Sequence, residues 1–143
     1  MQRLIVFLLI VWLCPTAAYC QFLKKKINRY DEDGQRTGLW KEYTDKEETL
    51  LLSKFYYLEG RETKVCKHYY QNGNVRLKFK YCKDRIKVKY FYKDGKLEKK
   101  GWAKIEYNTE DIHYFWEGEW QFFANPRKLI YREQYLLGEK VQE

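Results

Sequence analysis

The sequence predicts an all-β protein built from consecutive antiparallel β-hairpins that form one elongated, twisted sheet. Three observations predict this class. Apolar and charged residues alternate over short stretches, which is typical of strands with one packed face and one face in water. Turn residues such as Asn72-Gly73 and Asp94-Gly95 separate these stretches. A pattern of tryptophan, tyrosine and glycine returns at intervals of roughly twenty residues, which is typical of stacked supersecondary units.

The N-terminus has the three-part layout of a secretory signal peptide over 1–20. A basic start containing Arg3 precedes an apolar run, and small residues follow. That run is too short to span a bilayer, which needs about 20 residues. Cleavage is expected after Ala18 or after Cys20, and a lipid anchor on Cys20 is the less favoured outcome. The sequence therefore predicts an exported protein, periplasmic or secreted, with one domain over 21–143.

In the first half of that domain a turn is expected at 31–34 and another at 59–61. The expected strands are 39–43, 50–57, 65–70 and 75–81. Asn72-Gly73 between the last two predicts a two-residue hairpin turn, in which paired residues have numbers that sum to 145. Cys66 would then face Phe79.

In the second half, Val88, Tyr90 and Tyr92 are expected on the packed face of a strand that ends at Asp94-Gly95. The next strand, 97–107, contains Gly101, which suggests a bulge or a bend. Further strands are expected at 112–116, 120–123 and 129–137, with turns at 108–111 and at Asn125-Pro126 and with acidic residues at a turn around Gly118.

The repeat has two elements. Gly38, Trp40 and Tyr43 make the first, Gly-x-Trp-x-x-Tyr, and Tyr70 to Leu77 and Tyr92 to Leu97 make the second, Tyr-x-x-Gly. The residues expected to hold the repeat structure are Gly38, Trp40, Tyr43, Gly60, Gly73, Gly95, Gly118, Trp120 and Gly138.

These motifs resemble the MORN-repeat variant, which in bacteria is often named the YwqK family of antitoxins. The resemblance covers roughly 30–138 in about four repeats. It implies successive β-hairpins in an elongated sheet and a role in protein or membrane contact. An exported chain cannot neutralise a toxin in its own cytoplasm, so the antitoxin role of that family is not expected here.

The chain carries a formal net charge of +8. One group of basic residues is predicted to share a sheet face, namely Arg76, Lys78, Lys80, Lys87 and Lys89. Outside the cell such a face meets lipid head groups, acidic glycans or acidic proteins, and nucleic acid is not an expected partner. The plainer interpretation is that these lysines keep an exposed sheet soluble.

Aromatic residues make up 19% of the chain. In a thin sheet, rings that stack across strands supply apolar contact, so this richness is first a signal of the fold. A platform of rings for carbohydrate binding is the alternative.

Candidate catalytic groups are few. Glu117 and Glu119 lie between Trp116 and Trp120, as acids and rings would in a glycosidase cleft, but the same residues make the opening element of the repeat. Ser53, the one serine, would need His68 or His113, and no Gly-x-Ser-x-Gly surrounds it; both histidines are interpreted as packed sheet residues. No metal or phosphate motif is present, and no cofactor is expected.

Cys66 and Cys82 remain in the mature chain whether cleavage follows Ala18 or Cys20. An oxidising compartment permits a disulfide between them. The hairpin register places them on opposite faces, which argues against the bridge, although a bulge would change this.

The sequence therefore predicts a non-enzymatic exported repeat protein that acts as a binding or scaffold module for a protein partner or an anionic envelope surface. The alternative is a glycan-binding module, or a glycan-acting enzyme, that uses segment 116–120.

Overall fold

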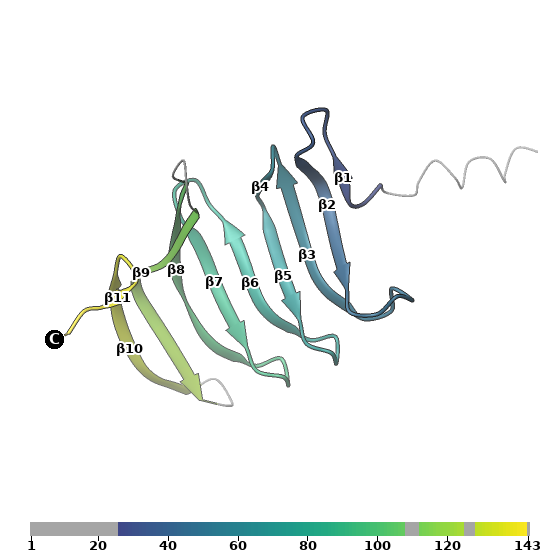
Figure 1. The fold of residues 1–143 in the computed structure, drawn as a ribbon. Helices are drawn as coiled ribbons and strands as arrows, with labels where there is room; N and C mark the ends of the chain where they lie inside the picture. Colours follow the sequence, from purple (N-terminus) through teal and green to yellow (C-terminus); the bar gives the residue numbers. More distant parts are fainter. Residues whose placement is uncertain (1–25, 108–111, 125–127, 143) are drawn as a thin grey trace, which may run out of the picture.

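The computed structural model describes residues 26–107, 112–124 and 128–142, so the predicted signal peptide lies outside the described residues. The described residues form one open antiparallel sheet and contain no helix (Figure 1). The strands are β1 (Arg29–Tyr30), β2 (Arg36–Tyr43), β3 (Leu51–Leu58), β4 (Arg61–Glu62), β5 (Val65–Tyr69), β6 (Val75–Tyr81), β7 (Ile86–Phe91), β8 (Leu97–Tyr107), β9 (Ile112–Ala124), β10 (Lys128–Leu136) and β11 (Glu139–Lys140). A helix able to cross a membrane is accordingly not found in this part of the chain.

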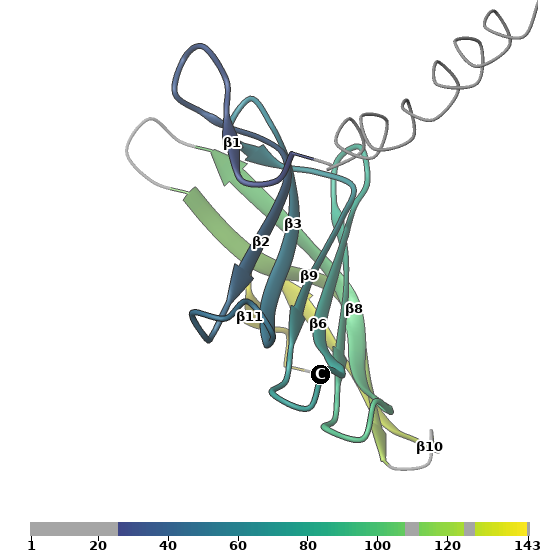
Figure 2. The same ribbon diagram turned by 90° about the vertical axis from the view of Figure 1, so that its right-hand side faces the viewer.

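Strands that follow one another in the chain lie beside one another in the sheet. The order is β1-β2-β3-β5-β6-β7-β8-β9-β10-β11, and the short β4 pairs with the end of β3. In the view of Figure 2, strands from the two ends of the sheet run in different directions, as the twist of a long sheet requires. The predicted fold class is confirmed.

The strand β9 corrects one expectation. Two strands separated by a turn were expected around Gly118, but β9 runs unbroken from Ile112 to Ala124. Gly118 has a φ of 72°, and the pairing with β8 shifts between Lys100 and Trp102. The glycine therefore accommodates a bulge instead of reversing the chain.

The hairpin between β5 and β6 has a different turn from the one predicted. The Gly73 amide donates to the Tyr70 carbonyl at 2.9 Å, and the Tyr70 amide donates to the Asn74 carbonyl at 2.8 Å. With Gly73 at a φ of 81°, this is a three-residue loop and not a two-residue turn at Asn72-Gly73.

The predicted register nevertheless survives. A second irregularity between His68 and Tyr69 compensates for the longer loop, and Cys66 pairs with Phe79 as predicted. From Leu77 to Tyr81 the faces of β6 are therefore those that the sequence indicated, because two one-residue displacements cancel, and Arg76 at the bulge is the exception.

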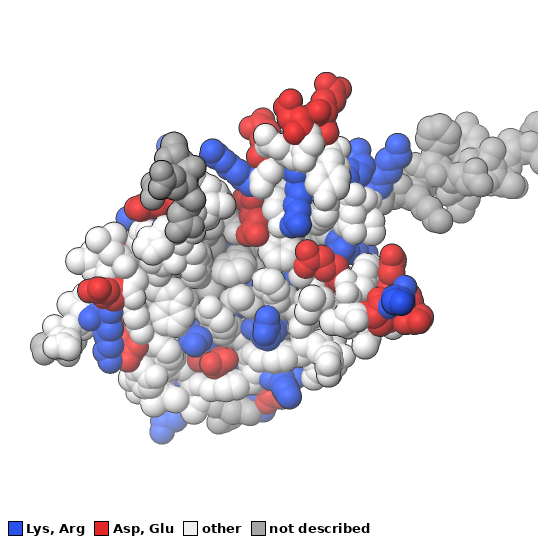
Figure 3. All heavy atoms as spheres, viewed as in Figure 1, with Lys and Arg blue, Asp and Glu red and all other residues white. Residues whose placement is uncertain are grey.

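One face of the sheet, called here the aromatic face, carries the core. Its buried residues form two clusters: Ile86, Val88, Ala103 and Trp120, and then Trp40, Phe55 and Cys66. Phe79 and Tyr81 pack against both clusters and join them. Figure 3 looks onto this face, where uncharged atoms predominate and charged groups are scattered or lie at the rim. The rings supply apolar contact in a core only one sheet thick, as expected.

The two ends of the sheet contain the same module, 80 residues apart. Gly38 and Gly118 lie inside strands with φ values of 74° and 72°. Two residues later Trp40 and Trp120 are buried, and each indole Nε1 donates to a backbone carbonyl at 3.1 Å and 2.9 Å. The repeat seen in the sequence is therefore also a structural repeat.

The surroundings of these tryptophans correspond as well. Tyr57 and Tyr135, which pair with the two glycines, meet the indoles edge-on at centroid distances of 5.9 and 6.4 Å. In addition, the Arg36 guanidinium lies over the Trp40 ring at 4.7 Å, and the Trp116 indole stacks on the Trp120 ring at 3.7 Å. A cation in one module therefore takes the place of a ring in the other.

The remaining repeat glycines lie at chain reversals. Gly60 and Gly138, with φ values of 71° and 87°, close two-residue turns between β3 and β4 and between β10 and β11. Gly73 and Gly95 hold the same left-handed position in the turns after β5 and β7. Tyr43 ends β2 opposite Leu51.

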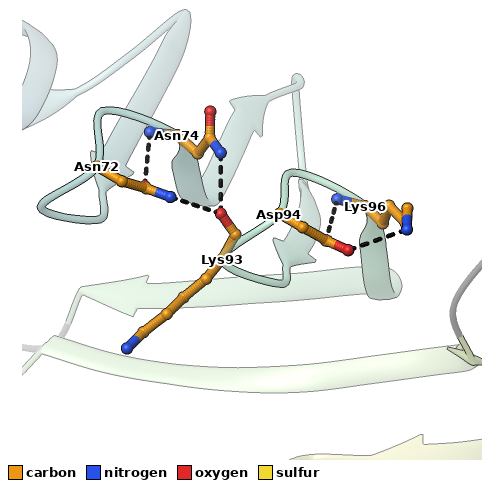
Figure 4. A network of polar contacts seen from close by, with 5 residues as sticks. All are labelled: Asn72, Asn74, Lys93, Asp94 and Lys96. Atoms are coloured by element: carbon orange, nitrogen blue, oxygen red, sulfur yellow. Dashed lines mark hydrogen bonds and ion pairs between the residues drawn. The ribbon is translucent and has the colours of Figure 1, made fainter.

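Neighbouring turns are tied to each other (Figure 4). Asn72 and Asn74 both donate side-chain N–H groups to the Lys93 carbonyl, at 2.8 and 2.9 Å. Asp94 accepts the Lys96 amide at 3.0 Å and pairs with its ammonium at 3.1 Å. The hairpin ends at this edge are thus positioned by side-chain contacts as well as by strand pairing.

Candidate functional site

Four of the predicted basic residues gather as one quartet on the face opposite the aromatic face. Lys78 on β6 lies directly opposite Lys89 on β7, and Lys80 lies opposite Lys87. These four lysines alone line a surface hollow of about 250 Å³. Directly opposite residues on antiparallel strands share a face, so the four ammonium groups point to the same side of the sheet.

Like charges lie close together in the quartet, and the nearest carboxylate in an adjoining hollow is that of Glu119, which pairs with Arg132. Burial, followed by the charges of Lys87, Lys78 and Lys100, lowers the pKa of Lys89 below its ordinary value. The ion pairs of the described residues involve other cations, and none includes a lysine of the quartet. Like charges directly opposite each other destabilise a sheet, so an anion bound here relieves repulsion.

Arg76 does not join the quartet. It is the extra residue of β6 at the bulge, between Val75 opposite Tyr69 and Leu77 opposite His68. Burial, followed by the charge of Arg76, lowers the pKa of His68, a side chain of the aromatic face. The bulge therefore separates Arg76 from the lysines with which simple alternation had grouped it.

The structure brings other lysines to the quartet that sequence reasoning missed. Lys67 lies opposite Lys78 on the β5 side, and Lys100 lies opposite Lys89 on the β8 side. The same register continues through Lys54 and Lys41. A signal was present in the sequence, because these lysines follow one another at intervals of 13, 13, 11, 11 and 11 residues.

A second hollow, of about 220 Å³, adjoins the first. It shares Lys87 and Lys89 with the quartet and extends past Lys100 and Trp102 to Gln121 and to Glu119, which is the one carboxylate in its lining. Arg85 lies over the Trp102 ring, 4.0 Å from the ring centroid, with Lys87 at 5.5 Å. The ring is thus already covered by cations and serves as a wall of the hollow.

The acidic and tryptophan-rich segment does not form a cleft. Trp116 and Trp120 stack on the aromatic face, and Trp120 is completely buried. Glu117 and Glu119 lie on the lysine side, paired with Lys104 and Arg132 at 3.6 Å each. The carboxylates and the rings of segment 116–120 therefore point away from each other.

The serine and the histidines are not arranged as a nucleophile and base. Ser53 is completely buried, and its hydroxyl donates to the Glu42 carboxylate at 2.8 Å. His68, on the neighbouring strand, lies between the rings of Phe55 and Phe79. Burial lowers its pKa, so it is neutral at pH 7. His113, expected to be packed, is exposed.

The two cysteines are free thiols, and their environments differ: one is buried and the other is exposed. Cys66 is buried on the aromatic face opposite Phe79, and burial raises its pKa to about 11. Cys82 is exposed just after β6. Among the described residues, no three His, Cys, Asp or Glu side chains are grouped to hold a metal ion.

Comparison of the chain with protein-family models, with curated proteins and with solved structures gives no match. Any function must therefore be argued from the geometry above.

Proposed function

We propose that this chain is a non-enzymatic, exported β-hairpin repeat protein that acts as a binding or scaffold module for a protein partner or an anionic envelope surface. The observation that carries the proposal is the quartet of Lys78, Lys80, Lys87 and Lys89, which lines a hollow without an acidic partner. A sheet whose turns after β5 and β7 are tied to each other can present such a face with little rearrangement, which lowers the entropic cost of binding.

Membership of the MORN-repeat variant is part of the same proposal. It is supported by the correspondence of Gly38 and Trp40 with Gly118 and Trp120, 80 residues apart. The exported location rests on the signal-peptide pattern of the sequence.

The test is a cross-linked pull-down with the tagged mature protein from the envelope fraction of its own host, washed at low and at high salt. A specific partner that is lost at high salt is expected, since exposed charge contacts are screened by salt. The variant K78E/K80E/K87E/K89E should lose this partner while remaining folded. The matched variant K26E/K46E/K83E/K93E, with the same change of charge at exposed positions outside the quartet, should keep it.

If both variants retain the same partner, the quartet is not the binding surface. The catalytic alternative is tested in the same preparation. The variant E117Q/E119Q should bind as the wild type does, because those carboxylates lie apart from the tryptophans and in ion pairs. A glycan-cleaving activity that this variant loses would overturn the non-enzymatic assignment.

A further inference from the structure

A single row of lysines crosses the sheet at right angles to its strands. Each member lies directly opposite the next on the neighbouring strand, from β2 to β8. This lysine row consists of Lys41, Lys54, Lys67, Lys78, Lys89 and Lys100. Beyond Lys100 the same register continues with Gln121 and Arg132.

The dimensions of the lysine row follow from the sheet. Neighbouring strands lie about 4.8 Å apart, so six lysines span about 24 Å measured from strand to strand along the twisted sheet. All six are half-buried, with their aliphatic stems packed along the sheet surface. The two adjoining hollows lie along the Lys78 to Lys100 part of the row.

The lysine row has one acidic neighbour in the hollows along it: Glu119 lines the second hollow beside Lys89 and Lys100, and it pairs with Arg132 and not with a lysine of the row. Among the described residues no member takes part in an ion pair. The spacing of about 4.8 Å is shorter than the Debye length of about 8 Å at physiological ionic strength, so each ammonium repels the next. A row of this kind gains most from a ligand that carries its own regularly spaced negative charges.

We infer that the lysine row binds a linear acidic polysaccharide, which lies across the strands with its sulfate or carboxylate groups on successive lysines. This inference rests on the proposed function and names the class of its anionic partner.

Other polyanions fit the lysine row less well. An extended peptide repeats its side chains on one face about every 6.7 Å, and it pairs along a sheet edge and not across the strands. Single-stranded nucleic acid needs free aromatic rings on which bases stack. The rings beside the row are covered by cations: Trp102 by Arg85 at 4.0 Å, Phe123 by Lys100 at 5.3 Å and Tyr56 by Lys54 at 5.8 Å.

A sugar chain matches the geometry of the lysine row. The units of an extended polysaccharide advance by nearly the distance between neighbouring strands, so an anionic group can reach each lysine in turn. A bilayer surface, in contrast, spreads its charges in two dimensions and would not require the cations to lie in one line.

The first experiment measures the binding of fluorescent heparin fragments of graded length to the full mature chain. Heparin is the probe because it is linear and sulfated, and neutral dextran of equal length is the control. Affinity should rise with fragment length until the fragment spans the row of about 24 Å and should then level off. Phosphatidylserine vesicles and polyglutamate are compared at equal concentrations of negative charge.

The second experiment compares two variants with equal net charge. K67Q/K78Q/K89Q/K100Q removes four members of the row, and K26Q/K46Q/K83Q/K93Q removes four exposed lysines outside it. The row variant should lose about a hundredfold in heparin affinity and about four units of salt slope, whereas the control should lose less than about threefold. K78R/K89R should preserve binding, because the positive charges are kept, and the far-UV circular dichroism of the row variant should match that of the wild type, which excludes unfolding as the cause of a loss.

Equal losses in the two variants would overturn the inference, because net charge and not the row would then determine binding. A preference for vesicles or polyglutamate over heparin would overturn the polysaccharide while leaving the proposed function intact. If none of these polyanions binds but a salt-sensitive protein partner is still recovered from the envelope, only the inference fails. If no partner is recovered either, the proposed function fails with it.

Discussion

The backbone of Gly101 on β8 lies directly beneath the indole of Trp120 on β9. A Cβ atom at position 101 would come within 2.3 Å of the Trp120 ring, closer than real Cβ contacts. The absence of a side chain at Gly101 therefore lets Trp120 lie flat, become fully buried and donate its Nε1 hydrogen to the Trp102 carbonyl at 2.9 Å. The irregularity expected at Gly101 lies instead on the neighbouring strand: Gly118, Glu119 and Trp120 of β9 face the single residue Gly101 of β8, which itself pairs regularly with Val88 of β7.

The variant Gly101→Ala should lower the free energy of unfolding by about 1–3 kcal/mol, because the added methyl group displaces the Trp120 indole. Denaturant unfolding followed by tryptophan fluorescence measures this loss. The double-mutant cycle with Trp120→Ala is the control, since contacting residues are non-additive. If Gly101→Ala costs the same in both backgrounds, the close approach is not the cause.

The tyrosines of the turns should contribute similar amounts of stability to successive hairpins. Tyr70 donates its hydroxyl hydrogen to the Phe91 carbonyl at 2.7 Å, and Tyr92 donates to the Phe123 carbonyl at 3.0 Å. Tyr70→Phe and Tyr92→Phe should each cost about 0.5–1.5 kcal/mol.

Thermal unfolding measures the stability of these two variants. Tyr43→Phe, which removes a hydroxyl group from the ring at the end of β2, is the control and should cost less. A Tyr70→Phe protein as stable as the wild type would show that the bond between the turns adds nothing to the pairing of the strands.

The two thiols should react very differently. Exposed Cys82 should be alkylated within minutes in the folded protein at pH 8, whereas buried Cys66, with its pKa raised to about 11, should react only after unfolding. Mass spectrometry after pulsed alkylation, with and without denaturant, distinguishes the two positions. Absence of label on both cysteines under non-reducing conditions, reversed by a reductant, would instead show that they are bridged.

The same thiol predicts a direction for alkaline stability. The pKa of Cys66 in the folded protein lies above its ordinary value of 9.0, so the unfolded chain loses this proton first as the pH rises. The contribution of the neutral thiol to the free energy of unfolding is therefore complete below pH 9 and is lost as the pH rises toward about 11. Cys66→Ala should therefore reduce the fall in the free energy of unfolding over this range, relative to the wild type. An unchanged slope would show that Cys66 ionises alike in both states.

Neutralising one central member of the lysine row should stabilise the free protein. Lys89 lies between Lys78 and Lys100, so Lys89→Gln should raise the free energy of unfolding by about 0.2–1 kcal/mol at low salt. The gain should disappear at high salt, where the charges are screened. Lys93→Gln, at an exposed turn, is the matched control and should show no such salt dependence.

Local patterns explain which elements could be predicted. The strands Val75–Tyr81 and Leu97–Tyr107 were expected with these bounds, because apolar alternation and flanking turn residues are properties of the segments themselves. The continuity of β9 through Gly118 could not be predicted in this way. Whether a glycine with positive φ ends a strand or forms a bulge depends on the strand that pairs with it.

The candidate site was predictable only within one hairpin and its neighbour. The quartet of Lys78, Lys80, Lys87 and Lys89 followed from alternation and a short connection, whereas Arg76 was misplaced because a bulge rotates it away. Glu119 and Trp120 are adjacent in sequence yet face opposite sides of the sheet, so their proximity suggested a cleft that the fold does not form.

By itself the sequence determined that this protein is an all-β array of hairpins, because alternation, turn chemistry and the glycine and tryptophan repeat act over a few residues. Only the tertiary structure decided that Lys41 and Lys100, 59 residues apart, belong to one continuous lysine row. Their alignment depends on the register of five successive strand pairs, and each bulge between them shifts that register by one residue. Whether these register shifts cancel or add depends on how all the strands pair. A pattern within one strand therefore does not predict the final alignment of residues on distant strands.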